Sequence, residues 1–150
     1  MKHPQRELKL YNVIFPVWMM MLFPTVWLIV LPGNFIIDSL VLIICMFALK
    51  MEEKKRFYLR HVFLVFAFGL LSDLIGSGYL FLLTFGFEVR HIDALYVTLP
   101  AVLIAAACIF ALNYFITFRK VEGKARRTLS LVFAIATAPY TFLIPLNWIY

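Results

Sequence analysis

Apolar residues along this 150-residue chain occur in long runs rather than in alternation with polar ones. A membrane-spanning helix needs about 20 mostly apolar residues, and most of the runs approach or exceed that length. The pattern predicts five spans, at roughly residues 11–31, 34–49, 61–85, 94–118 and 128–149. We therefore predict an all-α integral membrane protein, a five-transmembrane-helix bundle that forms one polytopic membrane domain over residues 1–150.

Composition and pattern together exclude two other classes of protein. The chain is 64% hydrophobic and 15% charged, whereas soluble domains are about 45–50% apolar and about 25% charged. A transmembrane β-barrel also satisfies its backbone groups in lipid, but its strands alternate apolar and polar residues. The solid apolar runs of this chain favour helices.

The connection between the first two predicted spans contains Leu31-Pro32-Gly33-Asn34, which is typical of a turn. The two spans are therefore predicted to form a tight helical hairpin. An alternative is a re-entrant hairpin in which Pro16 and Pro24 break the first helix. Because each limb is close to spanning length, we favour a hairpin that crosses the bilayer.

Basic residues predict the orientation of the spans. All Lys and Arg except Arg90 fall at the amino terminus or in the second and fourth connections: Lys2, Arg6, Lys9, Lys50, Lys54, Lys55, Arg56, Arg60, Arg119, Lys120, Lys124, Arg126 and Arg127. Five spans place all three segments on one side, and a Lys/Arg excess in short loops marks the cytoplasmic side. We expect a cytoplasmic amino terminus, an extracytoplasmic carboxyl terminus and residence in the cell membrane.

The net charge of +6 has the same explanation. Its basic residues lie where topology requires them and where anionic lipid headgroups would attract them. Acids such as Glu52, Glu53 and Glu122 dilute the clusters. A nucleic-acid partner is therefore not expected, and the predicted partners are the bilayer, its anionic headgroups, and either further copies of the chain or a larger membrane subunit.

Small residues predict which helices pack tightly, because they let helix backbones approach in lipid. At 100° per residue, the last three spans each present such a stripe on one face. The helix-packing residues are predicted to be Gly69, Ser72 and Gly76 in the third span, Ala101 and Ala105 in the fourth, and Ala134 and Ala138 in the fifth. The first span has no small stripe and is expected at the periphery.

Two acids fall inside the predicted spans, Asp38 and Asp73. A charge at the bilayer centre costs at least about 2.5–3.5 kcal/mol, and such residues usually face the bundle interior at a functional site. Asn34 precedes Asp38 by four residues and shares its helix face. No Lys or Arg exists within the spans. Each carboxyl group must therefore be protonated, hydrogen-bonded, hydrated or bound to a cation.

A purely structural interpretation of each acid stays open. Asp38 would lie about 6–9 Å below the outer surface, where it could cap the second helix or be wetted at the interface. A protonated Asp73 could bond a neighbouring backbone carbonyl. Asn113, near the inner end of the fourth span, is expected to be interfacial.

Three functions are compatible with these features, and a non-catalytic subunit or accessory protein of a membrane assembly is favoured by the small size and the short loops. The alternative is a small oligomeric transporter or channel with Asp38 and Asp73 in a proton or cation path. An intramembrane enzyme that uses both carboxylates is the third, and we do not expect it. The two cysteines and three histidines have no metal-ligand spacing, so no metal and no cofactor is predicted.

Overall fold

The structure, a computed structural model, describes residues 23–89 and 94–144, and this part of the chain is helical without strands. The elements are α2 (Pro24–Ala48), α3 (Lys54–Gly86), α4 (Leu95–Leu112), the π-helical turn η1 (Asn113–Thr117), α5 (Gly123–Ala136) and the 3-10 turn η2 (Tyr140–Leu143).

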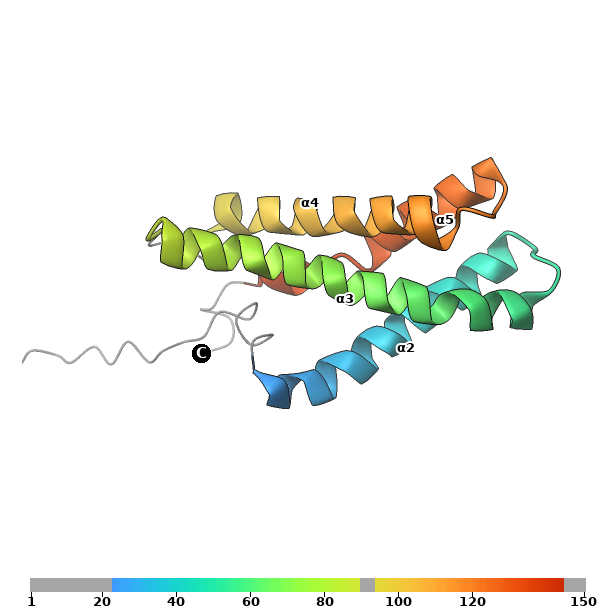
Figure 1. Cartoon of the computed structure of the whole chain (residues 1–150), viewed down its shortest axis with the longest axis horizontal. Helices are drawn as coiled ribbons and strands as arrows, with labels where there is room; N and C mark the ends of the chain where they lie inside the picture. Colours follow the sequence, from blue (N-terminus) through green and yellow to red (C-terminus); the bar gives the residue numbers. More distant parts are fainter. Residues whose placement is uncertain (1–22, 90–93, 145–150) are drawn as a thin grey trace, which may run out of the picture.

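Successive helices run antiparallel (Figure 1), as the short connections between them require. α3 packs against α2 and α4, while α5 contacts α4 and also reaches α2. The α2–α3 and α4–α5 connections lie at the same end of the bundle (Figure 1). These connections and the adjoining helix ends carry every Lys and Arg of the described residues. All of the positively charged side chains in this part of the chain therefore lie at one end of the bundle.

Within the described residues, three helices are long and apolar enough to cross a membrane: Pro24–Ala48, Lys54–Gly86 and Leu95–Thr117. The prediction of an all-helical fold is confirmed for the described residues, and these three helices fit a membrane protein. The third helix of the prediction begins earlier than expected, at Lys54, and the fourth agrees with the predicted range. The positions of both termini fall outside the described residues, so their predicted placement on opposite sides of the membrane stays a prediction.

The predicted turn between the first two spans is wrong. α2 continues through Leu31-Pro32-Gly33-Asn34 as one helix. Pro32 removes only the bond that its nitrogen would have made to the carbonyl of residue 28, and membrane helices tolerate Pro and Gly more readily than soluble ones. The hairpin is therefore absent, and the part of the first predicted span before residue 23 lies outside the described residues.

The fifth predicted span, 128–149, is not one continuous helix. α5 begins earlier, at Gly123, and ends at Ala136; η2 follows after a break at residues 137–139. Pro139 explains the break, because it has no N–H for the carbonyl of Ile135 and disfavours helical backbone at the residue before it. The hydroxyl of Tyr140 donates to that carbonyl instead. Residues 145–149 lie outside the described residues.

At Gly76 on α3, three elements approach one another closely. A Cβ atom there would lie 3.2 Å from the backbone oxygen of Ala101, 3.3 Å from Cβ of Ala105 and 3.0 Å from the ring of Phe142. Glycine thus lets α3, α4 and η2 meet. Two apolar clusters flank this level, one around Leu80 and Val102 and the other around Leu42 and Phe118.

Candidate functional site

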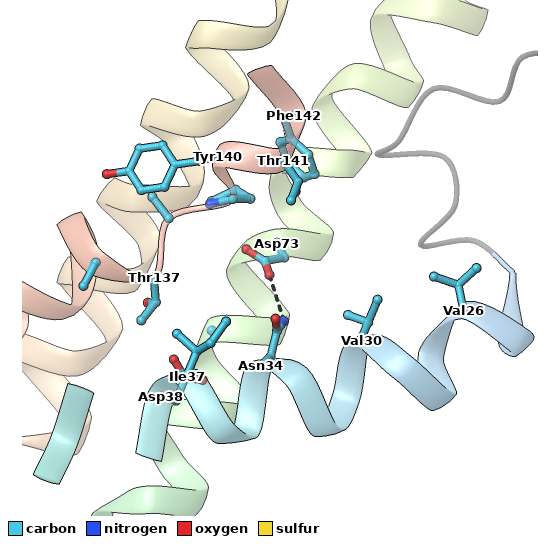
Figure 2. Close-up of a pocket in the computed structure, with 14 residues that line it drawn as sticks. Val26, Val30, Asn34, Ile37, Asp38, Asp73, Thr137, Tyr140, Thr141 and Phe142 are labelled. Atoms are coloured by element: carbon cyan, nitrogen blue, oxygen red, sulfur yellow. Dashed lines mark hydrogen bonds between the residues drawn. The ribbon is translucent and has the colours of Figure 1, made fainter. Parts of the chain in front are cut away.

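A pocket of about 350 Å³ opens between α2, α3 and the break that separates α5 from η2. We call it the acidic pocket, because both intramembrane acids line it. Its lining consists of Val26, Val30, Asn34, Ile37, Asp38, Gly69, Asp73 and residues 136–142. Figure 2 shows Asn34 and Asp73 facing one another from α2 and α3, with Tyr140 and Phe142 on the far side. The three walls come from distant parts of the sequence.

Asp73 lies well inside α3 and is only 6% exposed. Its Oδ2 accepts a hydrogen bond from the Asn34 side-chain amide at 3.4 Å. Its Oδ1 is buried and has no hydrogen-bond partner. A buried acceptor without a partner is costly in apolar surroundings, so this oxygen is a position for a proton.

Asp38 is 4% exposed and lies in the interior of α2. It is about 21 Å along the helix from Pro24, so it does not cap a helix start as one interpretation proposed. Its Oδ2 would be 3.3 Å from a Cβ atom at Gly69, so the glycine on α3 leaves room for the carboxyl group. Asp38 and Asp73 line the same pocket.

The two acids have no basic partner in the described part of the chain. The only ion pair among those residues joins Arg56 and Glu53, which are exposed. Two carboxylates that share apolar surroundings repel one another and lack solvation. The arrangement therefore favours a proton or another cation in the acidic pocket over two bare charges.

The break after α5 supplies the third wall. The Thr137 hydroxyl donates to the carbonyl of Phe133 at 2.8 Å, and the backbone N–H of Tyr140 donates to the carbonyl of Ala138 at 2.7 Å. These bonds hold a non-helical turn beside α2 and α3, and in membrane proteins such irregular backbone occurs where it is buried in protein or lines a cavity. Discontinuous helices that face a polar cavity form the binding sites of many transporters.

The sequence-predicted site residues are only partly brought together. Asp38, Asp73 and Asn34 line the acidic pocket, and so do Gly69 and Ala138 from the predicted packing stripes. Gly76, Ala101 and Ala105 meet at the α3–α4 contact instead. Ser72 is fully buried on α3, where its hydroxyl donates to the carbonyl of Phe68 at 2.7 Å, and Ala134 is buried on α5.

Sequence reasoning missed the wall formed by Thr137, Tyr140 and Thr141. Pro139 within a predicted span was the available signal, because proline interrupts helices. The interfacial position expected for Asn113 stays a prediction, and the structure adds its contacts within the bundle. Its side chain is fully buried, its Nδ2 donates to the carbonyl of Ile109 at 3.0 Å, and it begins the π-helical turn.

No family model, curated protein or solved structure matches this chain. Among the described residues, no group of three or more His, Cys, Asp or Glu side chains could hold a metal ion. The acidic pocket could still offer a small cation the carboxylates of Asp38 and Asp73 and the side-chain oxygens of Asn34, Thr137 and Thr141.

Proposed function

We propose that the protein is a small transporter or channel that binds a proton or small cation between Asp38 and Asp73 and passes it across the membrane. The observation that carries the proposal is the sharing of one pocket by two buried acids without a basic partner. Uncompensated carboxylates inside a membrane usually mark proton or ion paths. The pocket could hold a cation together with several water molecules, since each occupies about 30 Å³ in the liquid.

We also propose an orientation of the helices in the membrane. The two described basic connections face the cytoplasm, in accordance with the positive-inside rule, and the protein resides in the cell membrane. Five spans remain the proposed count, with α2, α3 and α4 as three of them and α5 with η2 contributing to the last. Several chains would assemble to complete the path, because one small bundle offers little room for a continuous one.

Flux through reconstituted vesicles tests the proposal. Purified protein is placed in vesicles, a membrane potential is imposed, and proton or Na⁺ entry is followed with an enclosed dye. Asp73→Asn and Asp38→Asn should each abolish the flux that the unsubstituted protein supports. Glu88→Gln is the matched control, because Glu88 is exposed in the α3–α4 connection. Unchanged flux in Asp73→Asn, with the protein intact by size-exclusion chromatography, would refute the proposal.

A second candidate function is a non-catalytic subunit beside a larger membrane protein. The observation that favours it is the outer face of α2, where Leu28, Ile29 and Ile44 are 76%, 78% and 65% exposed. Large exposed apolar faces can serve another subunit as well as lipid. Purification from its native membrane in mild detergent should then yield a stable complex with a second polypeptide, and a homogeneous preparation of this chain alone would contradict it.

The enzyme hypothesis requires a proton shared between two acids, as in aspartic proteases. In the described part of the chain, the carboxyl oxygens of Asp73 bond only to Asn34, and no hydrogen bond joins them to Asp38. The geometry therefore favours ion binding over two-carboxylate catalysis, and we propose no enzymatic activity.

A further inference from the structure

A second cavity lies at the end of the bundle that carries the basic connections. It has a volume of about 300 Å³ and opens between the start of α3 and the π-helical end of α4. Its polar lining consists of Arg60, His61, Thr117, Arg119 and Lys120. We call it the basic pocket. It shares no residue with the acidic pocket, so it is independent of the proposed function.

The charges of the basic pocket are all of one sign. Its lining includes two arginines and a lysine but no acid. Among the described residues, none of the three forms an ion pair, whereas Arg56 nearby is paired with Glu53 at 3.4 Å. Three cations around one concave site, next to apolar walls, attract an anion more strongly than the same charges spread over a flat surface.

Thr117 is an independent sign that the pocket takes a ligand. Its side chain is 5% exposed, and its hydroxyl is buried without a hydrogen-bond partner. Six other hydroxyls in the described residues donate to the carbonyl four residues earlier: those of Ser72, Thr84, Thr98, Thr128, Ser130 and Thr137.

The π-helical turn explains why Thr117 differs. The carbonyl of Asn113, which lies four residues before Thr117, accepts the backbone N–H of Phe118 at 2.8 Å. The Thr117 hydroxyl is buried without a hydrogen-bond partner in a residue that lines the basic pocket. Single π-helical turns occur frequently at functional sites.

His61 adds a second fixed polar group. Its Nδ1 is 2.7 Å from the carbonyl oxygen of Phe57, and its ring contacts the rings of both Phe57 and Phe118. Because a carbonyl only accepts hydrogen bonds, Nδ1 carries the hydrogen. Nε2 is then left for a ligand, as an acceptor in the neutral ring or as a donor in the protonated one.

We propose that the basic pocket binds a phosphate group. The guanidinium groups of arginine and a hydroxyl donor can form hydrogen bonds to the oxygens of a phosphate, and arginine commonly binds phosphate groups in proteins. Basic pockets between membrane helices bind the headgroups of anionic lipids, and a soluble phosphate ester presents the same chemistry. Either ligand would supply the negative charge that pairs with Arg60, Arg119 and Lys120.

Native mass spectrometry of the full chain in a neutral detergent tests this proposal. The protein is titrated with phosphatidylglycerol, with phosphatidylcholine and with glycerol phosphate. Retention of phosphatidylglycerol alone identifies a lipid headgroup as the ligand, and retention of glycerol phosphate as well identifies the phosphate ester as sufficient. Failure to retain either anion, or equal retention of phosphatidylcholine, would overturn the proposal.

Substitutions separate a built site from diffuse attraction. Arg60→Gln and Thr117→Val should each weaken binding about tenfold or more, because each removes a hydrogen bond to a charged group. Thr117→Ser keeps the hydroxyl and should bind as the unsubstituted protein does. Arg127→Gln is the matched control, since Arg127 is exposed in the same basic segment but does not line the pocket. Equal weakening by Arg127→Gln and Arg60→Gln would show that only overall charge matters and would overturn the proposal.

Discussion

The side-chain amide of Asn34 on α2 donates a hydrogen bond to Oδ2 of Asp73 on α3 across 3.4 Å. This bond ties two helices together at the acidic pocket and orients the carboxyl group whose other oxygen has no partner. Asn34 is thus a positioning residue for Asp73 in the proposed path.

Asn34→Leu should therefore raise the cation concentration at half-maximal flux several-fold while the maximal flux is reduced less. Leu suits the apolar environment, but it cannot hold the carboxyl group in place. Concentration-dependent flux in vesicles measures both quantities. A half-saturation value equal to that of the unsubstituted protein would show that the bond has no role in binding.

Gly76 and Gly78 provide a matched pair for the helix contact. A methyl group at Gly76 would meet Ala101, Ala105 and Phe142 within 3.3 Å, whereas nothing lies within 4 Å of one at Gly78. Gly76→Ala should lower the free energy of unfolding by about 1–3 kcal/mol, the usual cost of overpacking. Gly78→Ala should raise it by about 0.5–1 kcal/mol, because alanine favours a helix interior. Thermal unfolding in detergent compares the two, and equal midpoints would contradict the packing at Gly76.

Tyr140 should stabilise the break after α5. Its hydroxyl donates to the Ile135 carbonyl that Pro139 leaves without a backbone partner. Tyr140→Phe should cost about 1 kcal/mol of stability, a typical value for a lost hydrogen bond. Tyr96→Phe serves as the control, because Tyr96 is 70% exposed on α4. If both variants unfold at the same temperature, the Tyr140 bond does not contribute.

Topology is testable with single cysteines in a chain that carries Cys45→Ala and Cys108→Ala. We expect a cysteine at position 124, in the basic α4–α5 region, to be protected from a membrane-impermeant maleimide in intact cells. A cysteine at position 88, in the α3–α4 connection, should be labelled. In inverted vesicles the pattern should reverse. Labelling of both positions from the same side would contradict the proposed crossing of the membrane by α4.

Sequence patterns predicted the helices in the middle of the chain well, and those nearer its two ends poorly. α3 and α4 follow from long apolar runs, and the depth of Asp73 follows from its place in the third run. The prediction of a turn at Pro32-Gly33 was wrong because turn residues are tolerated within helices in lipid, where the backbone must form its hydrogen bonds within the protein. The acidic pocket could not be predicted, since one wall depends on a break at Pro139 that approaches α2 and α3 only in the fold.

The central claim is that Asp73 and Asp38 bind and release a proton or cation within the membrane. The most direct measurement is modification by an apolar carbodiimide, which reacts with protonated carboxyl groups in apolar surroundings, followed by mass spectrometry of the modified peptides. We predict modification at Asp73 or Asp38 that declines when the pH is raised or when Na⁺ is added. Modification confined to exposed acids such as Glu88, or unaffected by both pH and Na⁺, would contradict the claim.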